Sequence, residues 1–239
     1  MAAWAWVQRR SAATAAPWGW IPIGSFEQHG PHLPLATDTL IAIALAEALA
    51  DRFGGVLAPP VTVGCSQEHR RFPGTLSVPA ALLAAWVQAL VEGVAACGAR
   101  WVALVNGHGG NYVLEHVAAE GTAQSQEALH LVVLPQARHW EAALDRAGVP
   151  WKLDRDLHAG AVETALVMAL YPELGVVPPD PAQDVDPPAG PWVVAWGLDR
   201  YTPNGVLGRP SEATAEAGAR IWQALVDAVS DDWRRWTQG

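Results

Sequence analysis

The chain has 239 residues, of which 51% are hydrophobic and only 16% are charged, and its formal net charge is −9. This length and apolar content predict a folded domain with a full core and exclude a disordered chain. The acidic balance and the presence of a single lysine, Lys152, exclude the basic surface that binds nucleic acid.

Cysteine use and hydropathy exclude two further classes of protein. Cys65 and Cys97 are too few for a disulfide scaffold or a zinc cluster of thiolates. No uninterrupted apolar run reaches the ~18 residues that span a bilayer, since even the most apolar stretch, 80–96, contains Gln88 and Glu92. The sequence therefore predicts a cytoplasmic protein with no membrane partner.

The first half of the chain alternates between predicted strands and helices. Apolar residues at 18–24 predict a buried strand, and Thr37-Asp38 can cap the helix that follows. A second strand is predicted at 56–63, short or at a sheet edge because prolines interrupt it. Pro79 suits the first turn of a long helix that ends near Gly98.

The second half continues the alternation. Buried strands are predicted at 101–105 and 130–134, and a helix at 160–171. The proline-rich stretch 178–191 predicts an irregular loop, after which Ser211 can cap a closing amphipathic helix. We expect one α/β domain over residues 1–239, with a mostly parallel sheet covered on both faces, because no repeat or long linker divides the chain.

The first candidate site follows the first strand, in Gly24-Ser-Phe-Glu-Gln-His-Gly-Pro-His-Leu-Pro-Leu-Ala-Thr-Asp38. Glu27, His29 and Asp38 supply oxygen and nitrogen donors that suit Zn²⁺, Mn²⁺ or Fe²⁺. The alternative is a polar turn in which Asp38 only caps the helix. Both interpretations stay open from these residues alone.

Two further clusters follow later elements. Asn106-Gly-His108-Gly-Gly-Asn111 places a histidine among glycines at a strand end, where the backbone can approach an ion; an ordinary tight turn or a phosphate cradle is the alternative. His158 and Glu163 lie around a helix start, where they either reach a common site or serve as a cap and a solvated side chain. The remaining histidines 116, 130 and 139 lack partners at ligand spacing and are predicted to be surface or packing residues.

Together these segments resemble the creatininase family of metal-dependent amidohydrolases. The resemblance rests on the three clusters, on Phe72-Pro-Gly-Thr75, and on Asn204-Gly-Val-Leu-Gly208 with Ala213-Thr-Ala-Glu216. It implies a three-layer α/β/α fold, two divalent metal ions per subunit (zinc, manganese or iron) and a homo-oligomer, usually a hexamer. Low charge and tryptophans such as Trp4, Trp6 and Trp196 would suit buried subunit interfaces.

The resemblance also implies a set of metal ligands. The matching residues are Glu27, His29, Asp38 and His108, with Asp38 bridging both ions. Creatininase has a carboxylate two positions after its matching histidine, where this chain has Gly110, and Glu163 is the expected replacement ligand.

The implied reaction is hydrolysis of a C–N amide bond. Hydroxide generated between the two cations attacks the carbonyl carbon, and His158, which matches a catalytic histidine, acts as general acid or base with Glu163 in the catalytic set. The alternative is a noncatalytic α/β module that binds a phosphorylated small molecule.

The substrate is left open by the sequence. Creatininase carries a Trp-Asp pair where this chain has Asp154-Arg155, and Arg155 can pair with a peptide carboxylate. The motifs also resemble the subgroup that trims the C-terminus of the mycofactocin precursor peptide, so a peptide C-terminus and a cyclic amide such as creatinine are both candidates. Related hydrolases act on formamides or cyclic ketoses. The expected substrate-binding residues are His69, Ser77, Gly109 and Arg155.

Overall fold

The computed structural model describes residues 17–126 and 128–238, within which four strands form one sheet. The strands are β1 (Trp18–Ile23), β2 (Val56–Leu57), β3 (Trp101–Asn106) and β4 (His130–Leu134). All pairs are parallel, and the order is β2-β1-β3-β4. The predicted parallel sheet is confirmed, and β2 is both short and at the edge, as its prolines predicted.

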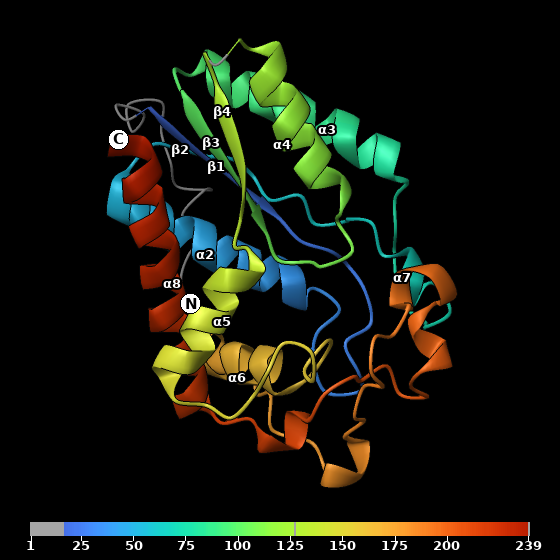
Figure 1. The fold of residues 1–239 in the computed structure, drawn as a ribbon. Helices are drawn as coiled ribbons and strands as arrows, with labels where there is room; N and C mark the ends of the chain where they lie inside the picture. The colour runs from blue at the N-terminus through green and yellow to red at the C-terminus, as the bar shows by residue number, and fades with distance from the viewer. Residues whose placement is uncertain (1–16, 127, 239) are drawn as a thin grey trace.

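Helices cover both faces of the sheet (Figure 1). One face carries α3 (Ala80–Ala96) and α4 (Val113–Gln124); the other carries α2 (Thr37–Phe53), with α5 (Ala137–Ala147), α6 (Ala161–Leu170) and α8 (Ala215–Gln238) packed around it. A short helix, α7 (Val193–Trp196), lies apart from these layers. The expected three-layer α/β/α fold is confirmed. Among the described residues, no helix combines the length and apolar character needed to cross a membrane.

The strands divide their side chains between two cores. On β3, Ala103 and Val105 belong to the core beneath α2, whereas Val102 and Leu104 belong to the core beneath α3 and α4. This division follows from the two-residue period of a strand and explains why the run at 101–105 is apolar throughout. In the α2-side core, Trp20 of β1 packs on Trp233 of α8 with ring centroids 4.5 Å apart.

Two predicted helix caps are wrong. The N-cap of α2 is Ala36, and Asp38 lies inside the first turn. The Asp38 carboxylate does not cap the helix but contacts Ser25 and His29. Ser211 lies in a 3-10 turn at 210–212 and donates its hydroxyl to Asp184, while Thr214 accepts the hydrogen bond of Ala217 N–H at the start of α8. In both cases another polar group competes successfully for the predicted capping side chain.

The ends of β1 and β3 lie side by side, because Ile23 pairs with Asn106. The glycine after each strand end lets the first turn of α2 approach closely. A Cβ on Gly24 would lie 2.4 Å from Thr39 Cα, and a Cβ on Gly107 would lie 2.2 Å from the Asp38 carbonyl oxygen. The backbone therefore brings α2 against both strand ends, where the candidate site lies.

Asp156 fixes the start of α6 and thereby the position of Glu163. Its carboxylate accepts the N–H groups of Ala161 and Val162, each at 2.8 Å. Asp156→Asn leaves one of these donors without an acceptor, so we expect the free energy of unfolding to fall by about 1–3 kcal/mol. Urea denaturation measures the loss, and Asp154→Asn, which changes an exposed aspartate two residues away, should shift stability by less than about 0.5 kcal/mol. Equal stability of the two variants would contradict this role.

Candidate metal centre

Asp38 lies at the centre of the candidate site, with an exposed fraction of 2%. Its Oδ1 is 3.1 Å from His29 Nε2, and its Oδ2 is 3.0 Å from His108 Nδ1. The Ser25 hydroxyl also donates to Oδ2, at 2.7 Å. The carboxylate thus joins the loop after β1 to the loop after β3.

Backbone carbonyls fix which nitrogen of each imidazole faces Asp38. His29 Nδ1–H donates to the carbonyl oxygen of Glu27 at 3.1 Å, and His108 Nε2–H donates to that of Cys65 at 2.9 Å. A carbonyl oxygen only accepts hydrogen bonds, so these two nitrogens carry protons. The other nitrogens, which face Asp38, are therefore the ones that a proton or a metal ion can occupy.

The carboxylates of this centre favour positive charge on His29 and His108. Burial lowers the pKa of His29, but the charge and hydrogen bond of Asp38 outweigh it and raise the pKa to about 10. Burial likewise lowers the pKa of His108, but Glu27 and Asp38 raise it well above its ordinary value. Divalent cations compete with protons for such nitrogens, because a ligating imidazole must be unprotonated on the metal side.

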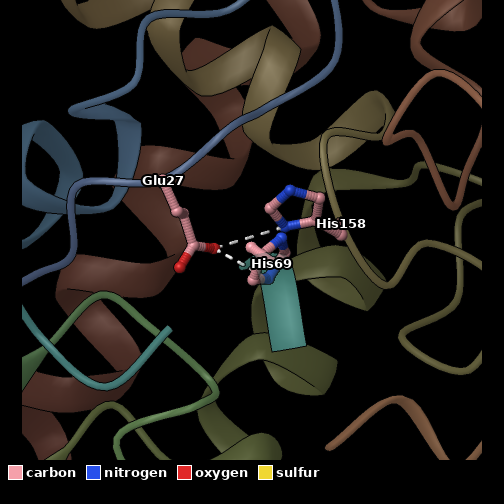
Figure 2. A group of neighbouring side chains, drawn as sticks. All are labelled: Glu27, His69 and His158. Atoms are coloured by element: carbon pink, nitrogen blue, oxygen red, sulfur yellow. Dashed lines mark ion pairs between the residues drawn. The ribbon is translucent and has the colours of Figure 1, made fainter. Parts of the chain in front are cut away.

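Glu27 lies beside His69 and His158 and is completely buried. Its Oε1 is 3.1 Å from His69 Nε2 and 3.7 Å from His158 Nδ1, as Figure 2 shows, and its Oε2 is 3.2 Å from His108 Nε2. Neither oxygen accepts a hydrogen bond from the described residues. Burial raises the pKa of Glu27 to about 7. Buried polar atoms rarely lack partners, so this carboxylate fits a bound cation.

Glu163 and His158 complete the far side of the centre. Glu163, in the first turn of α6, has Oε1 4.0 Å from His29 Nε2, and its Oε2 accepts the Ala159 N–H. Burial raises the pKa of Glu163 to about 7. The His158 Nε2–H donates to the Gln28 carbonyl at 2.7 Å, which leaves Nδ1 free on the side of Glu27. Burial, with the charges of His29 and His69, lowers the pKa of His158 well below its ordinary value.

In the described part of the chain, three groups of side chains have donor atoms close enough to hold a metal ion. In each group the donor atoms lie within 4.8 Å of one another, and the groups are Glu27, His29 and Asp38; His29, His158 and Glu163; and Glu27, His69 and His158. Carboxylates and imidazoles are the ligands of zinc, manganese and iron. The donor set, and a Glu27 carboxylate that accepts no hydrogen bond from the described residues, therefore fit a bound metal ion, although the predicted ligand His108 is in none of the three groups.

A cavity of about 290 Å³ opens above these side chains. Its polar lining residues include Asp38, His108, His158 and Glu163. Its largely apolar lining, called the apolar wall below, is formed by Tyr112, Leu157, Pro191, Val193, Val194, Leu198 and Leu207. No lysine or arginine is among the described residues that line it. The cavity thus combines metal-binding groups with a largely apolar wall.

The structure brings two of the four expected substrate-binding residues to this cavity. His69 and Gly109 line it. Ser77 does not: it is exposed, and its hydroxyl accepts the Ser66 N–H. Arg155 lies in a separate surface cavity with Asp186 and Arg209.

Sequence reasoning missed two buried residues of the site. Glu68 directly precedes His69 and lines the cavity. Gln28, between the metal-site candidates Glu27 and His29, donates its side-chain amide to His69 Nδ1 at 3.0 Å. Adjacency to residues already singled out was the available signal for both.

The sequence matches a known family over almost its whole length. A family model described as creatininase, creatinine amidohydrolase, matches residues 2–232. The chain belongs to the creatininase family. The resemblance inferred from the motifs is thus confirmed, and so is the hydrolase class.

Individual relatives agree with this assignment. A mycofactocin precursor peptide peptidase of Mycobacterium ulcerans is 38% identical over 232 residues, covering 92% of this chain and 85% of that protein. A creatinine amidohydrolase of Pseudomonas putida is 29% identical, covering 88% and 86%. Both relatives are named as hydrolases, which disfavours the alternative that this chain is a noncatalytic binding module.

Solved creatininases share the fold. A structure described as creatininase Mn superposes with a TM-score of 0.75 at 28% identity, covering 97% of this chain and 95% of that chain. A creatininase variant described as the Zn-Zn type gives a TM-score of 0.75 at 27% identity with the same coverage. Family members thus bind manganese or zinc, which are two of the three metals expected from the donor set.

Proposed function

We propose that this creatininase-family chain is a dinuclear metal-dependent amidohydrolase that cleaves a C–N amide bond. The proposed metal ligands are Glu27, His29, Asp38, His108 and Glu163. Among these ligands, Asp38 is the one that the geometry supports most strongly. Its two oxygens face two different histidines at 3.1 and 3.0 Å, as a bridging carboxylate requires. This observation carries the proposal.

The side chains divide into two sets around Asp38. His29 and Glu163 lie on the Oδ1 side and His108 lies on the Oδ2 side, while Glu27 has a donor atom within 4.8 Å of those of His29 and Asp38. Two divalent ions, when bound, polarise the amide carbonyl and lower the pKa of water. The carboxylates of Glu27, Asp38 and Glu163 compensate most of the charge of such a pair. The backbone carbonyls that accept hydrogen bonds from His29 and His108 hold both rings in the orientation that ligation needs.

His158 is the proposed general acid and base. Its Nε2–H is held by the Gln28 carbonyl, so Nδ1 is the atom that takes and returns a proton. Nδ1 accepts a proton from the attacking water, and delivers it to the leaving nitrogen, which cannot depart as an amide anion. The ring of His158 is buried against the rings of His29 and His69, with centroids 4.3 Å from each. This environment keeps His158 neutral at the start of the cycle.

A peptide of the mycofactocin precursor type is the proposed substrate, with creatinine, formamides and cyclic ketoses as the alternatives. The proposal is supported by the 38% identity to a mycofactocin precursor peptide peptidase, against 29% to a creatinine amidohydrolase. The apolar wall of the cavity suits an apolar peptide end. Arg155 is not retained as the carboxylate partner, because it lies outside this cavity.

One experiment tests both parts of the proposal. Protein purified without chelator is analysed for metal and then incubated with a mycofactocin-type precursor peptide or with creatinine. We expect about two divalent ions per chain, peptide cleavage faster than creatinine opening, and loss of activity on chelation that added Zn²⁺ or Mn²⁺ restores. Activity that survives complete metal removal would contradict the mechanism, and faster turnover of creatinine would contradict the substrate.

We also propose a cytoplasmic homo-oligomer, with six subunits as the resemblance implied. Exposed apolar side chains support an interface around α7, where Trp192 and Trp196 are 68% and 54% exposed and stack with centroids 6.3 Å apart. Trp4 and Trp6 lie outside the described residues. Light scattering at micromolar concentration should give the mass of six chains, and the mass of one chain would contradict the prediction.

A further inference from the structure

Glu68 is a buried carboxylate that the proposed mechanism does not use. It lies in the 3-10 turn Gln67–His69, is 6% exposed, and lines the cavity beside His108. A buried carboxylate is costly unless a donor or a positive charge accompanies it. None of the described residues that line the cavity is a lysine or an arginine, and the cationic side chain in contact with Glu68 there is a histidine.

His108 is that group. Glu68 Oε1 lies 3.5 Å from His108 Nε2. Burial raises the pKa of Glu68, but the hydrogen bond and charge of His108 outweigh it, so the pKa of the carboxyl is lowered. The same Nε2–H donates to the Cys65 carbonyl, and the opposite nitrogen, Nδ1, faces Asp38. Glu68 therefore lies behind the ring, on the side away from Asp38.

The packing around Gly110 holds Glu68 in this place. A Cβ on Gly110 would lie 2.2 Å from Glu68 Oε1, 2.3 Å from His108 Nε2 and 2.5 Å from the Cys65 carbonyl oxygen. Gly110 does not have a positive φ, so space and not backbone conformation requires glycine here. The three polar atoms fill the volume that any side chain at position 110 would occupy.

We propose that Glu68 is a positioning residue for the metal ligand His108. Its carboxylate acts together with the Cys65 carbonyl and with Glu27 Oε2, which is 3.2 Å from the same nitrogen; the three acceptors keep the proton on Nε2, orient the ring, and make Nδ1 a stronger donor toward the metal. Carboxylates that accept the second N–H of a ligating histidine have this effect in metal sites generally. The inference rests on the proposed function, because it needs His108 to be a ligand. From the described residues, the Nδ1–H of His29 has a backbone carbonyl as its only hydrogen-bond acceptor, so the two metal sites differ in this support.

The test measures the affinity of each metal site separately. Metal-free protein, prepared by dialysis against a chelator, is titrated with Zn²⁺ in competition with a chromogenic chelator. The variants are Glu68→Gln, which keeps size and removes charge; Glu115→Gln, the same change at an exposed position on α4; and His108→Ala, which identifies the site of His108. We expect Glu68→Gln to weaken the His108 site by about 10–100-fold and to leave the other site unchanged. Glu115→Gln should match the wild type.

Two further measurements separate positioning from ligation and from folding. Loading with Co²⁺ should give a shifted visible absorption band at the weakened site of Glu68→Gln, because the ring orientation changes. Thermal unfolding of the metal-free variants reports folding; if Glu68→Gln does not fold, Glu68→Asp, which keeps the charge but shortens the side chain, should weaken the same site.

The outcomes distinguish this inference from the proposed function. Wild-type affinities in Glu68→Gln would overturn the inference, and so would complete loss of one site, since Glu68 would then itself be a ligand. Equal weakening of both sites would also overturn it. A wild-type chain that binds no metal would overturn the proposed function instead.

Discussion

Asp38→Ala is expected to lower metal occupancy at both sites and to abolish detectable amide hydrolysis. Each oxygen of this carboxylate faces a different histidine, so one substitution removes a ligand from each ion. The affinity of each site should fall by more than about 10–100-fold, the loss that follows when only a group supporting a ligand is removed. Elemental analysis after equilibration with limiting Zn²⁺ measures the occupancy.

A matched aspartate variant controls for the loss of a negative charge. Asp154→Ala changes an exposed aspartate and should retain both ions and full activity. The contradictory outcome is the loss of one ion only from Asp38→Ala, which would make Asp38 a terminal ligand. Because Asp38 also accepts the Ser25 hydroxyl, circular dichroism should accompany the analysis to show that α2 remains folded.

His158→Ala is expected to retain both metals and to lower turnover by about 10²–10⁴-fold, the usual range for a positioned acid or base. The Nδ1 atom faces the interior of the site while Nε2 is held by the Gln28 carbonyl, so the ring is oriented for proton transfer. The deficit should be smaller for an amide whose leaving amine is a weaker base and needs less protonation. Single-turnover rates with two such amides measure the difference.

The same comparison separates three roles for His158. A ligand, which its place among the metal-binding groups also allows, would lose a metal ion on substitution. A purely structural histidine would slow both amides equally. His116→Ala, at an exposed position on α4, should leave the metal content and both rates unchanged. Equal deficits for the two amides, with both metals retained, would exclude the acid role.

Much of the fold was predictable because its strands are strongly apolar. The runs at 101–105 and 130–134 form β3 and β4 with few changes at their ends, since burial on both faces requires continuous apolar sequence. The helices α4 and α5 were not predicted. Among the residues of α4 only Val113, Leu114 and Val117 are large and apolar. Helix α5 begins with a capping box formed by Gln136 and His139, which is not a usual capping pair.

The motifs predicted which residues come together in the candidate site, but not which neighbouring charged residues are buried there. Glu27, His29, Asp38, His108, His158 and Glu163 meet at the carboxyl ends of β1 and β3, as polar clusters after parallel strands commonly do. Glu68 and Arg155 show the limit of this reasoning. Both are single charged residues beside a motif, yet the fold buries Glu68 in the cavity and leaves Arg155 on the surface. Only tertiary packing decides between these outcomes.

The close approach of α2 to the glycines after β1 and β3 has an evolutionary consequence. At Gly24 and Gly107 the backbone after each strand contacts the backbone of α2 directly. The spacing of Asp38, His29 and His108 therefore depends little on the identity of surrounding side chains. The apolar wall, by contrast, comes from separate segments such as 191–198. Mutations there can alter what the cavity accepts while the reaction chemistry is inherited unchanged. A single ancestral scaffold can therefore diversify into relatives named for a precursor peptide and for creatinine.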